Sequence, residues 1–329
     1  MLKSLEIERL RGIRQGRIEN FAPLSVLVGQ NGSGKSTVLD ALLIAGSQQI
    51  GPAIGQAVQR RTTLDFAAPW LLWRGGGSDE PARVTLGTEQ RTFWIEIRRG
   101  MRATNQDELL VTVDAAIKGS HLLITFVRGN AFTPMNSQAY ASSSPVAFIR
   151  LIEATRGERL DRLLTEAIKA GRRRAVESLL GEIIPGLVSV QMLTDKAGSP
   201  EVHFEFDWGS VPVALAGDGL HALTRLVYEL ATPQDALLLI EEPEVHMHPR
   251  ALDAAARAMV ETVKRGNQIV VSTHSLDLID DLIRAADTTG MLDQLAVFRT
   301  AIVDGELRTS RFPGEEAQFA RDQIEEDLR

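Results

Sequence analysis

A glycine-rich segment between two apolar runs is the feature that most constrains this chain. Residues 29–37 read GQNGSGKST and fit the pattern G-x-x-x-x-G-K-[S/T]. The run at 23–28 predicts a short buried strand before it, and the run at 38–44 predicts a buried helix after it. Glycines let successive N–H groups converge on phosphate oxygens, and a helix N-terminus adds about half a positive charge. A turn that only caps a helix is the alternative, but the flanking strand and helix favour a nucleoside triphosphate site.

Every position of this phosphate loop is a candidate nucleotide-binding residue. The set is Gly29, Gln30, Asn31, Gly32, Ser33, Gly34, Lys35, Ser36 and Thr37. In this motif Lys35 would reach the β- and γ-phosphates, and the hydroxyl of Ser36 would ligate Mg²⁺. The sequence therefore predicts a bound nucleotide together with a magnesium ion.

Composition narrows the class of protein. With 329 residues, 44% hydrophobic and 24% charged, the chain is expected to be globular. No run of about 18 apolar residues predicts a membrane span, and acids at the N-terminus argue against a signal peptide. Without cysteine, disulfides and thiolate sites are excluded, and a cytoplasmic location is the simplest expectation. A net charge of −7 does not favour general nucleic-acid binding, although arginine clusters such as that at 169–174 leave a local DNA contact open.

The hydrophobic pattern changes its period along the chain. Residues 1–28 read as strands, alternating runs between 83 and 127 predict an antiparallel sheet, and 46–79 and 130–144 read as loops. Later segments are expected as helices at 160–168 and 176–184, strands at 188–193, 202–206 and 211–215, a helix from 219, a strand at 236–240, a helix from 249, a strand at 268–272 and a helix from 275. The final alternation of strand and helix implies parallel strands with crossover helices.

Two acids follow the apolar strand at 236–240. The carboxylate of Glu241 could complete a Mg²⁺ site, and Glu242 could orient or deprotonate the attacking water. A solvated strand end is the alternative reading. Paired acids at the end of a buried strand, together with a phosphate loop, favour a nucleotide site.

A histidine stands at the end of the next expected strand. Residues 268–275 read QIVVSTHS, so His274 precedes a helix that starts at Ser275. Such a side chain can hydrogen-bond the γ-phosphate or the attacking water. Alone it would more often cap a helix or lie in the core, but the phosphate loop and the paired acids favour a functional role.

Together these motifs resemble ABC-type ATPases of the SMC/RecF/OLD branch. The run EEPEVHMHP at 241–249, the opening residues 2–13 and the segment AGDGL at 216–220 carry the resemblance, which spans about 1–46 and 211–310. It implies an α/β fold, a P-loop NTPase head with a parallel core sheet, an antiparallel β subdomain and a small helical lobe. The expected single head, 1–329, divides into a β and phosphate-loop lobe at 1–145, a helical and signature lobe at 146–232 and the rest of the core at 233–329.

The resemblance also implies roles for individual residues. ATP is the expected substrate, with Lys35, Glu242 and His274 catalytic, Ser36 and Glu241 on Mg²⁺, and Arg11 near the nucleotide. Gly217, Asp218 and Gly219 match the signature, which in this family acts in trans between heads that dimerise head-to-tail. Family ATPases place residues such as 247–248 at the dimer interface. Gln56 is the candidate for the glutamine loop.

This chain departs from the family pattern at two positions. The family's usual acid on the Mg²⁺ side is Asp, where this chain has Glu241, and the signature lacks its usual serine, with Ala214 and Ala216 nearby. Losing a hydroxyl aimed at the γ-phosphate removes a hydrogen bond worth roughly 1.5–3 kcal/mol. We therefore expect slow hydrolysis and an assembly gated by ATP.

The expected function is regulation of a separate effector in DNA maintenance or anti-phage defence by a homodimer or a higher even oligomer. OLD nucleases carry a further Toprim domain, whereas only 55 residues follow His274 here, without an Asp-x-Asp pair. A nucleotide-dependent scaffold without turnover remains an alternative. A transporter's ATP-binding subunit is a further alternative, but the transporter signature is missing. A metal site at His246 and His248 is another, but a third ligand is missing.

Overall fold

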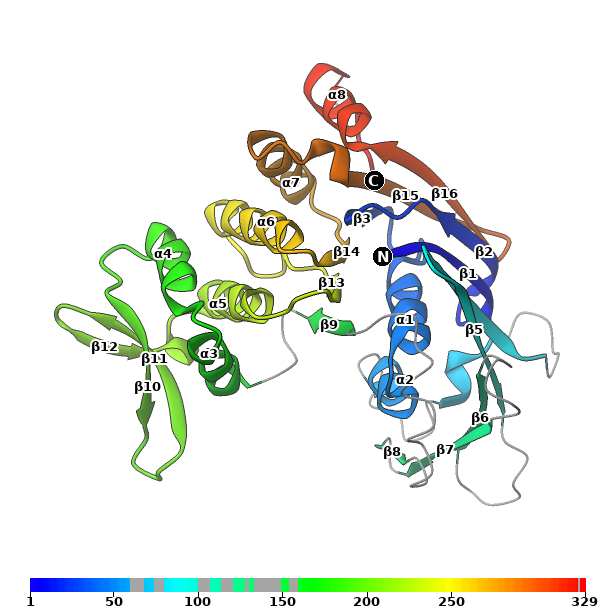
Figure 1. The fold of residues 1–329 in the computed structure, drawn as a ribbon, viewed down its shortest axis with the longest axis horizontal. Helices are drawn as coiled ribbons and strands as arrows, with labels where there is room; N and C mark the ends of the chain where they lie inside the picture. The colour runs from blue at the N-terminus through cyan, green and yellow to red at the C-terminus, as the bar shows by residue number, and fades with distance from the viewer. Residues whose placement is uncertain are drawn as a thin grey trace.

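One sheet that joins a parallel part to an antiparallel part organises the molecule (Figure 1). The structure is a computed structural model that describes residues 1–59, 68–73, 80–99, 107–113, 121–127, 130–132, 149–153, 159–324 and 326–329. Within these residues thirteen strands pair in the order β8-β7-β6-β5-β4-β1-β2-β16-β15-β3-β14-β13-β9. Their bounds are β1 Leu2–Leu10, β2 Ile13–Glu19, β3 Leu24–Val28, β4 Ala82–Thr88, β5 Thr92–Arg99, β6 Asp107–Val113, β7 His121–Val127, β8 Asn130–Phe132, β9 Ile149–Glu153, β13 Leu237–Glu241, β14 Gln268–Ser272, β15 Leu295–Val303 and β16 Glu306–Pro313.

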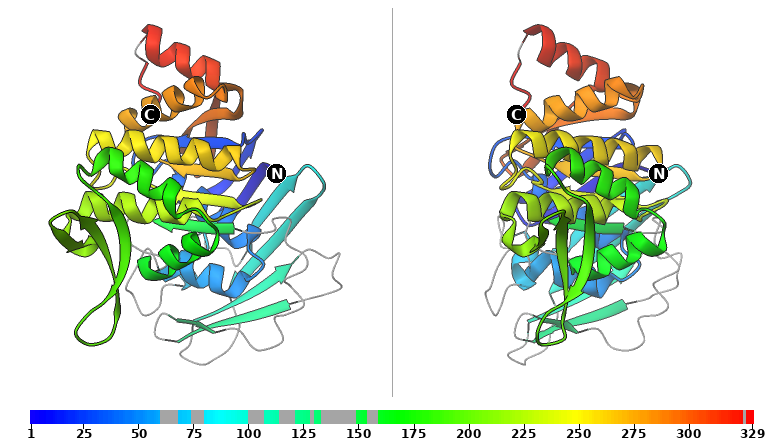
Figure 2. Two further views of the ribbon diagram at one scale, coloured as in Figure 1. Left: turned by 60° about the vertical axis from the view of Figure 1, so that its left-hand side comes forward. Right: turned by 90° about the vertical axis from the view of Figure 1, so that its left-hand side faces the viewer.

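The helices and a smaller sheet complete the fold. The helices are α1 Lys35–Gly46, α2 Ile50–Gln59, α3 Leu160–Lys169, α4 Arg173–Ile183, α5 Asp218–Ala231, α6 Pro249–Lys264, α7 Leu276–Thr288 and α8 Gly314–Ile324, with short 3₁₀ turns at Ala68–Leu71, Val213–Leu215 and Leu292–Gln294. A three-stranded antiparallel sheet contains β10 Ser189–Thr194, β11 Pro200–Phe206 and β12 Gly209–Pro212. Figure 2 shows this sheet, with α3 and α4, as a lobe that projects beside the helices of the core.

The parallel part holds the ends of the functional strands together. β15, β3, β14, β13 and β9 are parallel neighbours, so their carboxyl ends meet at one edge of the sheet. The register sets Glu241 beside Ser272 on one side and beside Glu153 on the other. Ligands of open parallel sheets bind at this edge.

Alternation along the strands builds two separate cores. Leu238 and Ile240 belong to a core shared with α5, α6 and α7, whereas Leu237 and Leu239 belong to a core shared with α1 and α2. Successive side chains of a strand point to opposite faces, so a strand buried on both faces is a continuous apolar run. In Figure 1 α1 and α2 lie on one side of the sheet, and α5, α6 and α7 lie on the other.

The expected fold class is confirmed, with several local corrections. β9, which pairs with β13, and α2, within the expected loop at 46–79, were not anticipated. The strand expected at 211–215 ends at Pro212 and continues as a 3₁₀ turn. The antiparallel strands β4 to β7 form as predicted, yet they continue the large sheet through β1. Most of the expected loop at 130–144, from 133 onward, lies outside the described residues.

The division into three parts stays a prediction. β9, at the start of the expected helical lobe, is itself a strand of the core sheet. In the described part of the chain no helix is both long and apolar enough to span a membrane.

Candidate nucleotide site

The phosphate loop connects β3 to α1 as the sequence predicts. Gly29 has φ +144° and Gly34, which precedes α1, has φ +95°. A Cβ atom at Gly29 would lie 2.4 Å from the carbonyl oxygen of Thr300, so this turn can pass β15 only as glycine. The start of α1, whose first N–H groups have no acceptor within the helix, therefore follows the carboxyl end of β3 through this turn.

A chain of hydrogen bonds fixes the loop from within. The ammonium of Lys35 donates to the carbonyl of Gly29 at 2.7 Å, to that of Gln30 at 3.1 Å and to the hydroxyl of Ser33 at 3.4 Å. Ser33 Oγ lies 3.0 Å from Oγ1 of Thr300, which donates to the carbonyl of Val28 at 3.0 Å. Since the Thr300 proton is used on Val28, the Ser33 hydroxyl donates to Thr300.

Acidic side chains surround the buried ammonium of Lys35. The side chain is only 4% exposed, and burial lowers its pKa from the usual value. The negative charges of Glu242, Glu244 and Glu241, in that order of strength, act in the opposite direction. Glu241 and Glu242 were predicted as site residues, and Glu244 follows them in the chain. All three carboxylates therefore lie close enough to Lys35 to act on its charge.

The oxygen donors needed for magnesium are present. Ser36 lies in the first turn of α1 and Glu241 ends β13, so hydroxyl and carboxylate oxygens come from the two elements that the sequence indicates. Mg²⁺ is usually held by one or two protein ligands, with phosphates and water completing its shell. In the described residues no group of three or more His, Cys, Asp or Glu could hold a metal by itself. The donor set therefore fits a metal shared with a nucleotide.

Glu242 turns out of β13 in an uncommon backbone conformation. Its φ is +43°, and its N–H donates to the carbonyl of Ser272 at 2.9 Å, which ties this turn to the end of β14. The side chain is 39% exposed, and its Oε1 lies 3.3 Å from Nε2 of His274. Backbone strain of this kind, held by a hydrogen bond, is frequent at functional sites.

Glu244 lies in the candidate site, although the sequence predicted no role for it. Its Oε1 accepts from Oγ1 of Thr273 at 2.7 Å and from the backbone N–H of His274 at 2.8 Å. Its Oε2 is buried and has no hydrogen-bond partner within the described part of the chain. The third glutamate of the run EEPE therefore fixes the backbone that presents His274. Its position two residues after Glu242 was the only signal in the sequence.

Arg11 lies against the two helices that follow the phosphate loop. Its Nε is 2.9 Å from Oδ2 of Asp40, a fully buried residue of α1, and its guanidinium donates to the carbonyl of Ala57 on α2 at 2.5 Å. These contacts give Arg11 a structural role, and the predicted role near the nucleotide stays a prediction.

The expected signature begins α5 and contacts the loop that follows Glu242. Gly217, with φ +93°, caps the helix, and both it and Asp218 are exposed. A Cβ atom at Gly219 would lie 2.5 Å from the carbonyl oxygen of His246, so only glycine allows this close approach. Gly217 and Asp218 are therefore accessible to a second molecule.

The remaining candidates have other positions. His248 caps α6, its Nδ1 accepting from the N–H of Arg250 at 3.3 Å, while His246 is exposed. Gln56 is exposed on α2, whereas Glu153 ends β9 directly beside Glu241. Glu153 occupies the strand end where a further side chain could reach the nucleotide, and sequence reasoning missed it because β9 was not recognised.

Comparison with protein families gives two matches. Residues 106–280, more than half of the chain, match the family described as "AAA domain, putative AbiEii toxin, Type IV TA system", and residues 4–119 match one described as "AAA domain". Two uncharacterised proteins of Methanocaldococcus jannaschii are also similar. MJECL11 is 30% identical over 115 residues, 34% of this chain and 98% of that protein. MJECL10 is 31% identical over 75 residues, 23% of this chain and 31% of that protein.

Solved structures show the same fold. The SMC head bound to the C-terminal winged-helix domain of ScpA superposes with a TM-score of 0.58 at 16% identity, covering 96% of this chain and 99% of that one. The Pyrococcus furiosus SMC head with an extended coiled coil, bound to the C-terminal domain of ScpA, gives 0.58 at 14%, covering 99% of each chain. The Thermotoga maritima SMC head gives 0.50 at 13%, with 94% and 98% coverage. The chain therefore belongs to the AAA-domain family matched over residues 106–280 and has the head fold of the SMC/RecF-like ABC-type ATPases.

Proposed function

We propose that this protein binds ATP with Mg²⁺ and hydrolyses it slowly, and that ATP drives a head-to-tail assembly which regulates a separate effector. The observation that carries the proposal is the convergence on one sheet edge of Lys35 with Glu241 and Glu242, the latter in contact with His274. A phosphate-binding cation, a metal-side acid, a base and a hydrogen-bonding histidine are the parts that phosphoryl transfer to water requires.

Each group would act at a defined point of the reaction. The loop from Gly29 to Thr37 would hold the phosphates, with Lys35 moving from its carbonyl partners to the β- and γ-phosphate oxygens. Ser36 and Glu241 would hold Mg²⁺, and the bound ion would neutralise part of the phosphate charge. Glu242 would take a proton from the attacking water, and His274 would donate a hydrogen bond to the γ-phosphate.

Two substitutions relative to the family pattern support slow turnover. Glu241 is one methylene longer than the usual aspartate, which moves the metal-side carboxylate relative to the loop. The signature offers Ala214 and Ala216 in place of a serine hydroxyl, so one hydrogen bond to the γ-phosphate is lost. Both changes leave nucleotide binding intact and weaken stabilisation of the transition state.

Surface features near the signature support assembly. Leu215 is 77% exposed and lies two residues before Gly217, so an apolar side chain stands beside the exposed anion-binding start of α5. A partner head that brings its ATP to this helix would cover Leu215. SMC heads of the same fold have been solved bound to domains of ScpA, and the description of the matched family names a putative toxin of a toxin–antitoxin system. Both observations favour a protein as the effector. DNA maintenance and anti-phage defence are the proposed contexts. In either context the arginines at 172–174 would contact DNA.

ATP turnover of the intact chain and of Glu242→Gln tests the hydrolysis step. The variant should bind Mg²⁺-ATP with unchanged affinity and lose turnover by roughly tenfold or more. Glu261→Gln, at an exposed position of α6, is the matched control and should turn over as the unaltered chain does. Equal, near-zero rates in all three proteins would instead support a nucleotide-dependent scaffold.

A further inference from the structure

A cavity is lined by residues that do not belong to the candidate nucleotide site. It encloses about 460 Å³ between α4, α5, α6 and α7, near the C-terminal ends of α5 and α6. Small-molecule sites usually measure about 300–1,000 Å³ and combine apolar walls with a few polar groups. The cavity has the size of such a site.

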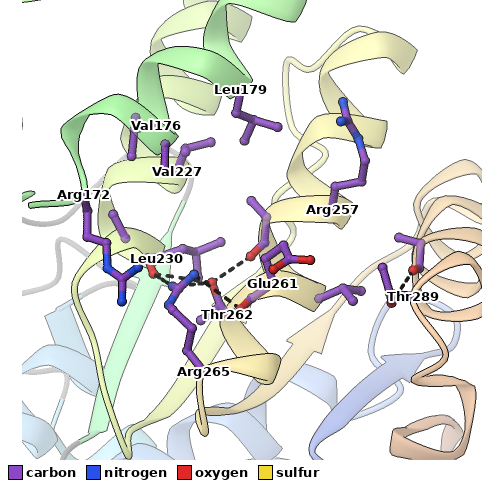
Figure 3. A pocket seen from close by; sticks show the side chains of 15 residues that line it. Arg172, Val176, Leu179, Val227, Leu230, Arg257, Glu261, Thr262, Arg265 and Thr289 are labelled. Atoms are coloured by element: carbon purple, nitrogen blue, oxygen red, sulfur yellow. Dashed lines mark hydrogen bonds between the residues drawn. The ribbon is translucent and has the colours of Figure 1, made fainter.

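The walls are apolar. Val176 and Leu179 of α4 face Val227 and Leu230 of α5 across it (Figure 3). Val176, Val227 and Leu230 are almost fully buried, and Leu179 is half-buried. An aliphatic group placed here would be removed from water at about 25 cal/mol per Å².

Two arginines stand together at one end. Arg172 immediately precedes α4 and Arg265 immediately follows α6, and both line the cavity. Figure 3 shows their side chains directed to the same end of the space. The pKa of Arg265 is lowered, first by burial and then by the positive charge of Arg172. The two guanidinium groups therefore repel each other, and an anion bound between them would relieve this repulsion.

Helix capping explains only part of this arrangement. Arg265 donates to the carbonyls of Leu230 and Glu261 and to the hydroxyl of Thr262, as a cation at helix C-termini does. Its Nε, however, is buried and lacks a hydrogen-bond partner among the described residues. Arg172 has no side-chain hydrogen bond or ion pair to any residue in the described ranges, and it lies at a helix N-terminus, where a cation is disfavoured.

The other charged side chains that line the cavity are paired. Arg257 lies 2.8 Å from Glu182 and 3.0 Å from Asp253, and Glu261 lies 2.8 Å from Lys264. The charge of Glu261 also acts on Arg265, less strongly than that of Arg172. Arg172 is therefore the cation lining the cavity whose side chain has neither a hydrogen bond nor an ion pair within the described ranges.

We propose that this cavity binds a small amphipathic anion, with its carboxylate or phosphate head between Arg172 and Arg265 and its aliphatic body along Val176, Leu179 and Val227. Guanidinium groups suit either head, because both present paired oxygens. The proposal does not depend on the nucleotide site, to which none of these residues belongs, and it shares Arg172 with the cluster proposed for DNA contact.

Calorimetric titration of the full chain tests this site, with decanoate, decyl phosphate and uncharged 1-decanol as probes below their aggregation concentrations. We expect saturable binding of at least one anion, and we expect 1-decanol to bind at least tenfold more weakly. The anion that binds more tightly identifies the preferred head group. Arg172→Gln should weaken anion binding at least tenfold. Arg174→Gln, an exposed neighbour outside the cavity, should bind as the unaltered chain does.

A second variant tests the apolar wall separately. Leu179→Glu places a negative charge at a half-buried position and should abolish anion binding while the circular dichroism of the protein stays unchanged. Absence of saturable binding by both anions would overturn the proposal, and so would equal anion affinities in Arg172→Gln and Arg174→Gln.

Discussion

The imidazole Nε2 of His274 lies 3.3 Å from the carboxylate Oε1 of Glu242. The two residues follow neighbouring parallel strands, and the hydrogen bond from the Glu242 N–H to the Ser272 carbonyl fixes the distance between those strand ends. A base and a hydrogen-bond donor held this close can address one water and one phosphoryl group. This relationship is the centre of the proposed mechanism.

Glu244→Ala should lower the rate of ATP hydrolysis by about tenfold while leaving ATP affinity nearly unchanged, because the side chain acts on the position of His274. The alanine variant loses both hydrogen bonds to residues 273 and 274. Glu244→Gln keeps an acceptor oxygen and should recover most of the rate. Measured kcat and KM for both variants distinguish this positioning role from a charge effect, which would affect both equally.

Thr300→Val should weaken ATP binding by about tenfold, since a buried Ser33 hydroxyl that loses its acceptor costs about 1–3 kcal/mol. The change preserves the shape of the side chain and removes only the hydroxyl between Ser33 and Val28. Thr309→Val, at a half-buried position of β16 away from the phosphate loop, is a suitable control. Titration with a fluorescent ATP analogue gives the dissociation constants, and an unchanged value for Thr300→Val would show that the loop does not need this support.

Arg11→Ala should reduce the free energy of unfolding by about 3 kcal/mol, because it leaves the carboxylate of Asp40 buried without its cation. Chemical denaturation measures the loss. The double variant Arg11→Ala/Asp40→Ala also removes the buried carboxylate and should recover part of the stability. If the double variant folds well yet binds ATP more weakly than Asp40→Ala alone, Arg11 also contacts the nucleotide; equal affinities would restrict it to the structural pair.

The positions of the candidate site residues were predictable where the motif consists of contiguous residues. The phosphate loop at 29–37, the acids after β13 and the histidine after β14 each combine an apolar strand with a characteristic ending, so local pattern suffices. Thr300 was not predictable, because its partner Ser33 lies 267 positions away along the chain. β9 was missed because its five residues, IRLIE, combine apolar and charged side chains and can form a strand or part of a helix, and only pairing with β13 decides between them. Glu244 and Arg172 depend likewise on tertiary contacts.

Assembly on ATP is the claim that a single measurement tests most directly. The measurement is the mass of Glu242→Gln in solution by light scattering, with and without Mg²⁺-ATP, because this variant should bind ATP and stop before hydrolysis. The double variant Glu242→Gln/Leu215→Asp carries a charge at the expected interface. Glu242→Gln/Phe319→Asp carries one at another exposed apolar position, on α8.

The account predicts that ATP doubles the mass of Glu242→Gln and of its Phe319→Asp control, and that Leu215→Asp prevents the doubling. A protein that binds ATP but keeps the same mass would contradict it, whether that mass is of one chain or of a constitutive assembly.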